Sequence, residues 1–132
     1  MRKLRVLIVD DNPMFLREAR NFLAELQNVE CVACANSGAE ALVRVDEFRP
    51  DLVLMDIVMP GMSGLETMLV LRSRLPALRM YAVSLDDAAE YRAAALKNGA
   101  DGVISKHEFA EAIPDLIAQL ACDGDAPSNR EP

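Results

Sequence analysis

The chain has 132 residues, a length that fits one domain with a single core. Hydrophobic residues make up 52% of the sequence, which indicates a packed interior and excludes a disordered chain. The formal net charge of −7 argues against direct nucleic-acid binding and against an anionic membrane surface, because both partners require a basic face.

The N-terminus joins a positive cluster to apolar residues, as a secretion signal does. Its apolar run, Leu4–Val9, has six residues, which is too short for the core of a signal peptide. The run also contains Arg5 and is followed by two acids. No run approaches the roughly 20 apolar residues that a membrane-spanning helix needs. We therefore expect a cytoplasmic protein.

Short apolar runs alternate along the chain with longer segments of helical period. The runs are rich in Val, Leu and Ile and are bounded by polar residues, Gly or Pro, so they predict strands. The predicted strands are Leu4–Val9, Val29–Ala35, Leu52–Met55, Arg79–Val83 and Gly102–Ile104. The predicted helices are Pro13–Leu26, Ser37–Phe48, Ser63–Leu75, Asp87–Asn98 and Glu108–Leu120.

Local signals mark several helix ends. The first helix has Asp11 or Asn12 as its cap and Pro at its first position. Ser37 and Glu40 have the spacing of a capping box at the start of the second helix. Gly99 is suited to end the fourth helix, because glycine readily adopts the left-handed conformation after a helix.

Five strand–helix repeats predict an α/β protein of (βα)5 type, with a doubly wound parallel sheet and helices on both faces. Strands of such a sheet are covered on both sides, which accounts for their almost uniformly apolar composition. The residues from 121 to 132 are polar and contain two prolines. We expect residues 1–120 to form the domain and residues 121–132 a disordered tail or the start of a linker.

Two of the three cysteines, Cys31 and Cys34, form a C-x-x-C pattern that is compatible with a metal or redox pair. They lie in a predicted strand, where residues three apart point to opposite faces. No second C-x-x-C follows. We therefore expect reduced thiols, two of them half-buried.

Carboxylates follow two of the predicted strands directly. Asp10 and Asp11 come after the first strand, and Asp56 comes after the third. In open α/β sheets this edge is where ligands bind, near the point at which the strand order reverses. Three clustered carboxylates repel one another unless a divalent cation neutralises them, and oxygen ligands suit Mg²⁺.

Ser84 follows the fourth strand and Lys106 lies just beyond the fifth. Taken singly, each of these polar residues has a plainer reading as a helix cap, a turn residue or a solvated charge. Their joint placement at successive strand ends favours a phosphoryl site, because acids hold a metal, a hydroxyl donates a hydrogen bond and an ammonium balances charge. A carboxylate is also a known covalent phosphoryl acceptor.

The segments "VLIVDDNP", "DLVLMDIVMPGMSGLE", "AVS" and "GADGVISK" resemble the receiver domain of two-component response regulators, a CheY-like family. The resemblance extends from Leu4 to about Leu120. It implies a flavodoxin-like fold with strand order 2-1-3-4-5. It also implies a signalling domain that promotes its own phosphorylation and dephosphorylation, and is not an enzyme acting on other substrates.

By this resemblance Asp56 is the phosphoacceptor, Ser84 the switch hydroxyl and Lys106 the cation that balances the phosphoryl charge. The Mg²⁺ ligands it implies are Asp10, Asp11, Asp56 and the backbone carbonyl of Val58. The implied donor is a sensor histidine kinase or a histidine phosphotransfer protein. A homodimer through the last two helices is a further implied partner.

Four positions depart from the usual pattern of the family. Val103 stands where an aromatic residue is usual, Leu85 where a small residue is usual, and His107 where a proline usually follows the lysine. We expect His107 to be a surface residue in the first turn. Pro114 falls inside the last predicted helix, so we expect that helix to be kinked or split there.

The leading function is a phosphorylation-driven module that acts through the segment from Leu85 to about Gly99 on a partner or on a domain outside these residues. The ending "GADGVISKHEF" is similar to receivers that precede a DNA-binding helix-turn-helix domain. Val58 and Asp86 occupy two positions that, by the resemblance, tune hydrolysis in the family; both lack a strong water-orienting group, so we expect slow self-dephosphorylation.

Three other functions fit the sequence to different degrees. A receiver-like binding module that works without phosphorylation remains the alternative, modestly favoured by the departures. An Mg²⁺-dependent phosphohydrolase typically carries a D-x-D pair on its first loop, whereas this chain has adjacent aspartates. A nucleotide- or flavin-binding domain would carry a glycine-rich phosphate loop after the first strand, and this sequence has none there.

Overall fold

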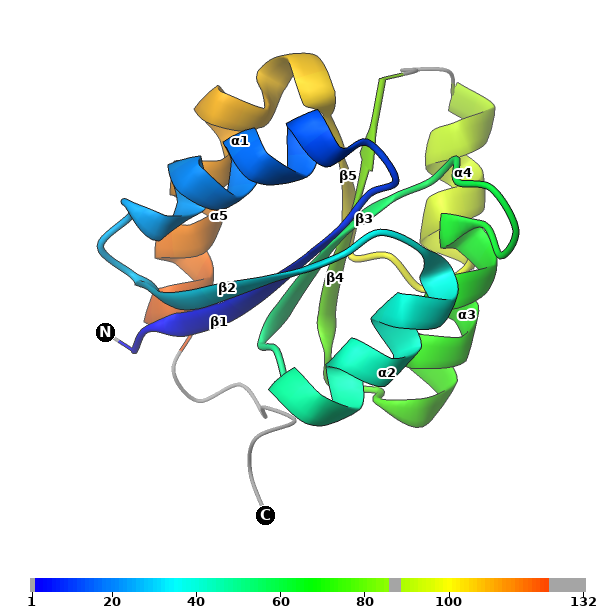
Figure 1. Cartoon of the computed structure of the whole chain (residues 1–132), viewed down its shortest axis with the longest axis horizontal. Helices are drawn as coiled ribbons and strands as arrows, with labels where there is room; N and C mark the ends of the chain where they lie inside the picture. The colour runs from blue at the N-terminus through cyan, green and yellow to red at the C-terminus, as the bar shows by residue number, and fades with distance from the viewer. Residues whose placement is uncertain (1, 86–88, 124–132) are drawn as a thin grey trace.

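The computed structural model describes residues 2–85 and 89–123. Strands and helices alternate through these residues, with one 3-10 turn, η1, before the last helix (Figure 1). The strands are β1 (Leu4–Val9), β2 (Val29–Ala35), β3 (Leu52–Asp56), β4 (Arg79–Ser84) and β5 (Gly102–Ser105). The helical segments are α1 (Pro13–Ala24), α2 (Gly38–Phe48), α3 (Gly64–Arg74), α4 (Ala89–Lys97), η1 (Lys106–Glu108) and α5 (Phe109–Cys122).

The strands form a single parallel sheet in the order β2-β1-β3-β4-β5. β1 lies between β2 and β3, with Val6 opposite Val32 on one side and Leu52 on the other. The order therefore reverses between β1 and β3, which is where α/β sheets bind their ligands. The predicted fold class and strand order are confirmed.

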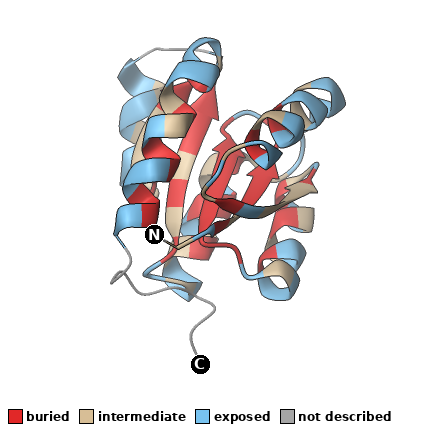
Figure 2. Ribbon diagram, turned by 90° about the vertical axis from the view of Figure 1, so that its left-hand side faces the viewer, coloured by how far each residue is buried: buried red, intermediate tan, exposed pale blue. Residues whose placement is uncertain are grey.

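Each face of the sheet carries its own hydrophobic core. Successive residues of a strand point to opposite faces, so Leu7 and Val9 join one core while Val6 and Ile8 join the other. Helices α2, α3 and α4 cover the first face, and α1 and α5 cover the second (Figure 1). Figure 2 shows the strands buried between helices whose outer sides are exposed.

Most predicted helix caps are present. The side chain of Asn12 accepts hydrogen bonds from the backbone N–H groups of the first turn of α1. Ser63 and Glu66 form a complete capping box at α3, which was not predicted from the sequence. At α2, Ser37 accepts from the Glu40 N–H at 3.1 Å, but the Glu40 carboxylate accepts from the N–H of Asn36 rather than that of Ser37. The predicted box is therefore only half formed.

Pro114 does not split the last helix, and this part of the prediction is wrong. The α-helix is continuous from Phe109 to Cys122, and the residues just before it form the 3-10 turn η1. Pro114 lies in the second turn, so the bond it removes is the one to the Ala110 carbonyl. Buried apolar residues along the whole length of α5 hold it against the sheet despite that loss.

The ends of two predicted elements differ from the sequence expectation. Ala121 and Cys122, placed in the tail, are the last residues of α5. The remainder of the predicted tail, from residue 124, and the predicted start of the fourth helix at Asp87 lie outside the described residues. Within them α4 begins at Ala89, and Gly99 follows it with φ of 108°.

All three cysteines lie in the described ranges, and no disulfide joins them. Cys31 and Cys34 are half-buried, as expected, and Cys122 is exposed. Among the described helices, none is both long and apolar enough to cross a membrane.

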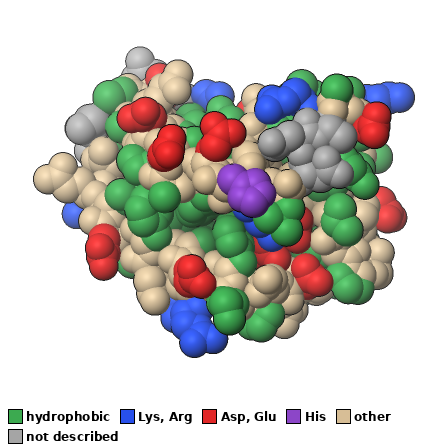
Figure 3. Space-filling model, turned by 90° about the horizontal axis from the view of Figure 1, so that it is seen from above, with side chains coloured by type: hydrophobic (Ala, Val, Ile, Leu, Met, Phe, Trp, Pro, Cys, Tyr) green, Lys and Arg blue, Asp and Glu red, His purple; other side chains and the backbone are tan. Residues whose placement is uncertain are grey.

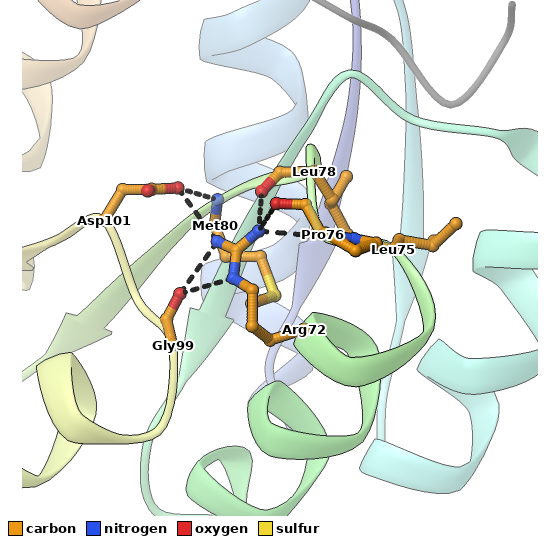
Figure 4. Close-up of polar contacts among 7 residues, drawn as sticks. All are labelled: Arg72, Leu75, Pro76, Leu78, Met80, Gly99 and Asp101. Carbon is orange, nitrogen blue, oxygen red and sulfur yellow. Dashed lines mark hydrogen bonds and ion pairs between the residues drawn. The ribbon is translucent and has the colours of Figure 1, made fainter.

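Arg72 near the end of α3 binds the backbone at the amino-terminal end of β4 and β5 (Figure 4). Its guanidinium donates to the carbonyls of Gly99 at 2.8 Å, Pro76 at 2.8 Å and Leu78 at 2.6 Å, and it pairs with Asp101 at 3.2 Å. The Asp101 carboxylate in turn accepts from the backbone N–H at the start of β4. This set of contacts, the Arg72 clamp, ties α3, the end of α4 and two strands together.

A second arginine, Arg5 in β1, joins β1 to the end of α2 and to the start of β3. The Arg5 guanidinium donates to the Phe48 carbonyl at the end of α2, at 2.8 Å and 3.0 Å, and lies 4.3 Å from the centre of the Phe48 ring. The backbone N–H of Arg5 donates to the buried carboxylate of Asp51. Both arginines therefore act at the amino-terminal edge of the sheet, away from the carboxyl ends of the strands.

Candidate functional site

Every strand except β2 ends in a polar side chain at one edge of the sheet. Asp10 and Asp11 follow β1, Asp56 and Ser84 are the last residues of β3 and β4, and Lys106 begins the turn after β5. β1, β3, β4 and β5 are neighbours in the sheet, so these side chains converge. Figure 3 looks onto this end of the molecule, where acidic side chains are spread among hydrophobic ones.

The converging side chains line an open pocket of about 370 Å³. All six residues predicted for the site border it, namely Asp10, Asp11, Asp56, Val58, Ser84 and Lys106. Among the other described residues, Asn12, Leu85 and Tyr91 also line it. The predicted grouping of these residues is therefore what the fold produces.

The three carboxylates lie close enough to share one cation. Asp10, Asp11 and Asp56 each offer an oxygen within 4.8 Å of the others. Asp10 and Asp56 are buried, while Asp11 is exposed at the pocket mouth. Such proximity of like charges is unfavourable without a counter-charge.

Lys106 supplies part of that counter-charge. Its Nζ lies 2.6 Å from Oδ2 of Asp10 and 3.8 Å from Oδ2 of Asp56. Among the described residues that line the pocket, Lys106 is the one cationic side chain and it faces three carboxylates, so carboxylates exceed cations there by two. A divalent cation would neutralise this excess.

A buried oxygen also supports a metal. Oδ1 of Asp10 accepts from the Asn12 N–H at 2.9 Å, but Oδ2 is buried and accepts no well-directed hydrogen bond from residues 2–85 and 89–123. Its contact with Lys106 is thus an ion pair without hydrogen-bond alignment. A hard cation that prefers oxygen ligands, such as Mg²⁺, fits these donors.

The environment of Asp56 raises the pKa of its carboxyl group to about 6, from an ordinary value of 3.8. Burial of the carboxylate is the main cause, and the negative charge of Asp10 adds to it. Lys106 and the Val58 N–H, which donates to Oδ1 at 3.3 Å, act in the opposite direction. Ionised Asp56 is therefore held in a high-energy state that a cation would relieve.

The chain around Asp56 explains how a buried strand presents a carboxylate. All five residues of β3 are buried, which fixes the position of its last residue. The chain then turns through Gly61, at φ of 74°, and returns at Gly64, whose N–H donates to the Ile57 carbonyl. A Cβ at Gly64 would overlap the carbonyl oxygen of Asp56, so only glycine fits there.

Two residues at the site were not expected from the sequence. The ring of Phe15 in α1 lies under Lys106, with its centre 4.5 Å from Nζ. Tyr91 in α4 borders the pocket and packs against the core. Their aromatic character at sheet-facing helix positions predicts burial, but no local pattern indicates which strand end they reach.

Besides Pro114, the other three departures from the family pattern fall in different environments. Leu85 is 63% exposed on the pocket wall, and His107 is exposed in η1, as expected. Val103 is half-buried and packs against the core on the α2–α4 face. Asp86, which was expected to influence hydrolysis, lies outside the described residues.

A five-stranded parallel sheet of this order, with the acid cluster and lysine at its carboxyl edge, defines a receiver domain. The chain belongs to the response regulator receiver domain family, whose model matches residues 6–118. The family makes it a signalling domain of two-component systems.

Particular relatives agree with this assignment. The chain is 46% identical over 115 residues to the transcriptional activator protein ExaE of Pseudomonas putida, covering 87% of this chain and 54% of the relative. It is 32% identical over 116 residues to the nitrate/nitrite response regulator protein NarL of Escherichia coli K12, covering 88% of this chain and 54% of that protein. The chain thus spans about half the length of these curated relatives.

A solved structure matches over nearly its whole length. The signal receiver domain of the putative response regulator NarL from Mycobacterium tuberculosis has a TM-score of 0.83 and 32% identity, covering 92% of this chain and 98% of that domain. This similarity covers the sheet and the helices on both of its faces.

Proposed function

We propose that this receiver domain accepts a phosphoryl group on the carboxylate of Asp56 in a reaction that depends on Mg²⁺. The observation that carries the proposal is the position of that carboxylate. It lies in a pocket open to donors, 3.8 Å from the Lys106 ammonium and beside two further carboxylates. This is the arrangement of negative and positive groups that phosphoryl transfer requires.

In the proposed step, a carboxylate oxygen of Asp56 attacks the phosphorus of a phosphoimidazole. The new bond joins that oxygen to phosphorus, and the phosphorus–nitrogen bond of the donor breaks. The electron pair of that bond stays on the imidazole nitrogen, which takes up a proton. The proposed donor is a phosphohistidine on a sensor histidine kinase or a histidine phosphotransfer protein.

Asp10, Asp11 and Asp56, together with the backbone carbonyl of Val58, are the proposed ligands of Mg²⁺. When bound, the cation would draw charge from the phosphoryl oxygens and allow the negative groups to approach one another. The excess of carboxylates over cationic side chains among the described pocket residues supports this role.

Lys106 and Ser84 are proposed to bind the phosphoryl group once it is attached. Lys106 already reaches both Asp10 and Asp56, so a short movement of its ammonium suffices to pair with a phosphoryl oxygen. Ser84 is buried at the end of β4 on the pocket wall, where a hydroxyl can donate to the same group. We propose that these new contacts bias the conformation of the segment from Leu85 to about Gly99.

The output is proposed from the relatives. ExaE is by its name a transcriptional activator and NarL a response regulator, and this chain matches about half of each. We propose that residues 1–120 form a cytoplasmic receiver that acts on a partner or on a domain outside these residues, with homodimerisation through the last two helices. We also propose slow self-dephosphorylation, because Val58 at the pocket wall offers no group to orient water.

The deciding experiment is intact mass spectrometry after incubation with acetyl phosphate and Mg²⁺. We expect a gain of one phosphoryl group in the wild-type protein and none in Asp56→Asn. The gain should disappear when EDTA replaces Mg²⁺. If neither acetyl phosphate nor a phosphorylated histidine kinase modifies the wild type, the proposal is wrong. The alternative, a binding module that works without phosphorylation, would then remain.

A further inference from the structure

The Lys106 side chain has a different neighbour on each side. Its ammonium faces Asp10 and Asp56 across the pocket and the ring of Phe15, 4.5 Å away, from α1. A lysine side chain has four rotatable bonds, so it loses much conformational entropy when it is held in one place. A charged group over an aromatic face gains attraction from the electron-rich ring, which offsets that loss.

Phe15 is itself held in place by other aromatic residues. Its ring meets Phe109 edge-to-face, with centres 5.4 Å apart and planes at 79°. Phe109 is buried at the start of α5 and also contacts Phe22, at 6.2 Å between ring centres. The packing of α1 against α5 therefore fixes the ring on which the Lys106 ammonium rests.

The local backbone alone does little to hold Lys106. It is the first residue of the short turn η1, in which the Phe109 N–H donates to the Lys106 carbonyl and the His107 N–H donates to the Ser105 side chain at 3.1 Å, and neither bond involves the ammonium. Apart from that ring, the printed contacts of the ammonium with described residues are those with its two carboxylate partners. One of these partners, Asp56, is the group that changes its charge and size when the phosphoryl group arrives.

We propose that Phe15 is a positioning residue for Lys106. Its ring holds the ammonium at the pocket while the ammonium exchanges a carboxylate partner for the phosphoryl group. The phosphoryl part of this inference rests on the proposed function, whereas the contact between ring and ammonium does not. The two parts can therefore be tested separately.

The contact itself is tested by NMR on the free, unphosphorylated protein. A ring this close to Nζ shifts the ε-methylene protons of Lys106 upfield through its ring current. We expect the shift in wild type and in Phe15→Tyr, which keeps the ring, and its loss in Phe15→Leu. Phe22→Leu is the matched control, because Phe22 contacts Phe109 but not Lys106. An unshifted Lys106 in wild type, or a shift that survives in Phe15→Leu, would overturn the proposal.

The consequence is tested by the affinity for beryllofluoride, a phosphoryl mimic, in the presence of Mg²⁺. We expect Phe15→Leu to bind about tenfold more weakly, and Phe15→Tyr and Phe22→Leu to stay within about twofold of wild type. Circular dichroism and urea denaturation establish that each variant is folded before its affinity is compared.

The combined outcomes separate the two proposals. If Phe15→Leu loses the ring-current shift but keeps full affinity, Phe15 does not position Lys106 for the phosphoryl group and the inference fails. If affinity falls equally in Phe22→Leu, the effect is one of general packing and the inference also fails. If wild type binds no beryllofluoride, the proposed function fails, and the ring-current comparison still decides whether Phe15 holds the ammonium.

Discussion

Replacing Asp56 by asparagine removes a charge that the folded protein accommodates poorly. The folded environment raises the pKa of Asp56 from 3.8 to about 6, so the folded state favours the neutral carboxyl group. Two pKa units at about 1.4 kcal/mol each give an upper limit of about 3 kcal/mol. The pocket is open to water, which screens the charge, so we expect Asp56→Asn to be more stable than wild type by about 1 to 3 kcal/mol at pH 7.5.

The dependence on pH has a definite sign. Between pH 3.8 and about 6 the folded state binds more protons at Asp56 than the unfolded state does, so wild type loses stability as pH rises through this window. The variant has no such group. The difference between them should therefore be near zero below pH 3.8, grow through the window and reach a plateau above pH 6.

Urea denaturation in Mg²⁺-free buffer at pH 7.5, 6.0 and 5.0 measures this difference. With slopes of roughly 1–3 kcal/mol per molar urea, the midpoint of the variant should move by about 1 M at pH 7.5. The exposed Asp115 provides the control, and Asp115→Asn should stay within about 0.5 kcal/mol of wild type. Equal midpoints at pH 7.5, or a difference that does not shrink toward acid pH, would refute the assigned environment of Asp56.

Three other changes have expected outcomes. Leu85→Ala, at an exposed position on the pocket wall, should speed phosphorylation by acetyl phosphate several-fold in a mass-spectrometric time course, and an unchanged rate would show that Leu85 does not obstruct entry. Arg72→Met should lower the free energy of unfolding by about 2 to 4 kcal/mol because the clamped carbonyls lose their donor, with phosphorylation by acetyl phosphate unaffected. Gly64→Ala should abolish phosphorylation and cost more than about 3 kcal/mol, whereas Gly61→Ala, with open space around its Cβ position, should cost only about 1 to 2 kcal/mol. Similar losses at the two glycines in urea denaturation would contradict the overlap described for Gly64.

The fold could be predicted from the sequence because its signals are local. Apolar runs, capping residues and the stop at Gly99 mark the elements, and strand–helix alternation limits the topology. The predicted strand ends were one residue short at β3, β4 and β5, because their last residues are polar. A polar residue that continues a strand into a binding site looks from sequence like the start of a loop.

The membership of the pocket was predictable for a geometric reason. Parallel strands place all their carboxyl ends at one edge, so polar residues at successive strand ends must meet there. The contacts that hold those residues were not predictable. Phe15 and Lys106 lie in the first and last parts of the chain, and only the packing of α1 against α5 brings them together.

The Arg72 clamp could not be predicted from the sequence, for a related reason. A single arginine near a helix end looks like a solvated charge, and its bonds go to backbone carbonyls that carry no residue-type signal. Pro114 is the opposite case, a strong local signal that tertiary packing overrides. Propensity describes one segment at a time, whereas the stability of α5 comes from its burial against the sheet.

The contacts of the two half-buried arginines have a consequence for how this domain can be re-engineered. Arg5 and Arg72 fasten the amino-terminal edge of the sheet, while the loops that would meet a donor all lie at the opposite edge. Substitutions at exposed positions of those loops, such as Leu85, therefore leave the contacts of both arginines in place. Variants of the proposed donor-facing surface can thus be made without weakening the opposite edge of the sheet, with Gly64 kept because a Cβ there overlaps the Asp56 carbonyl.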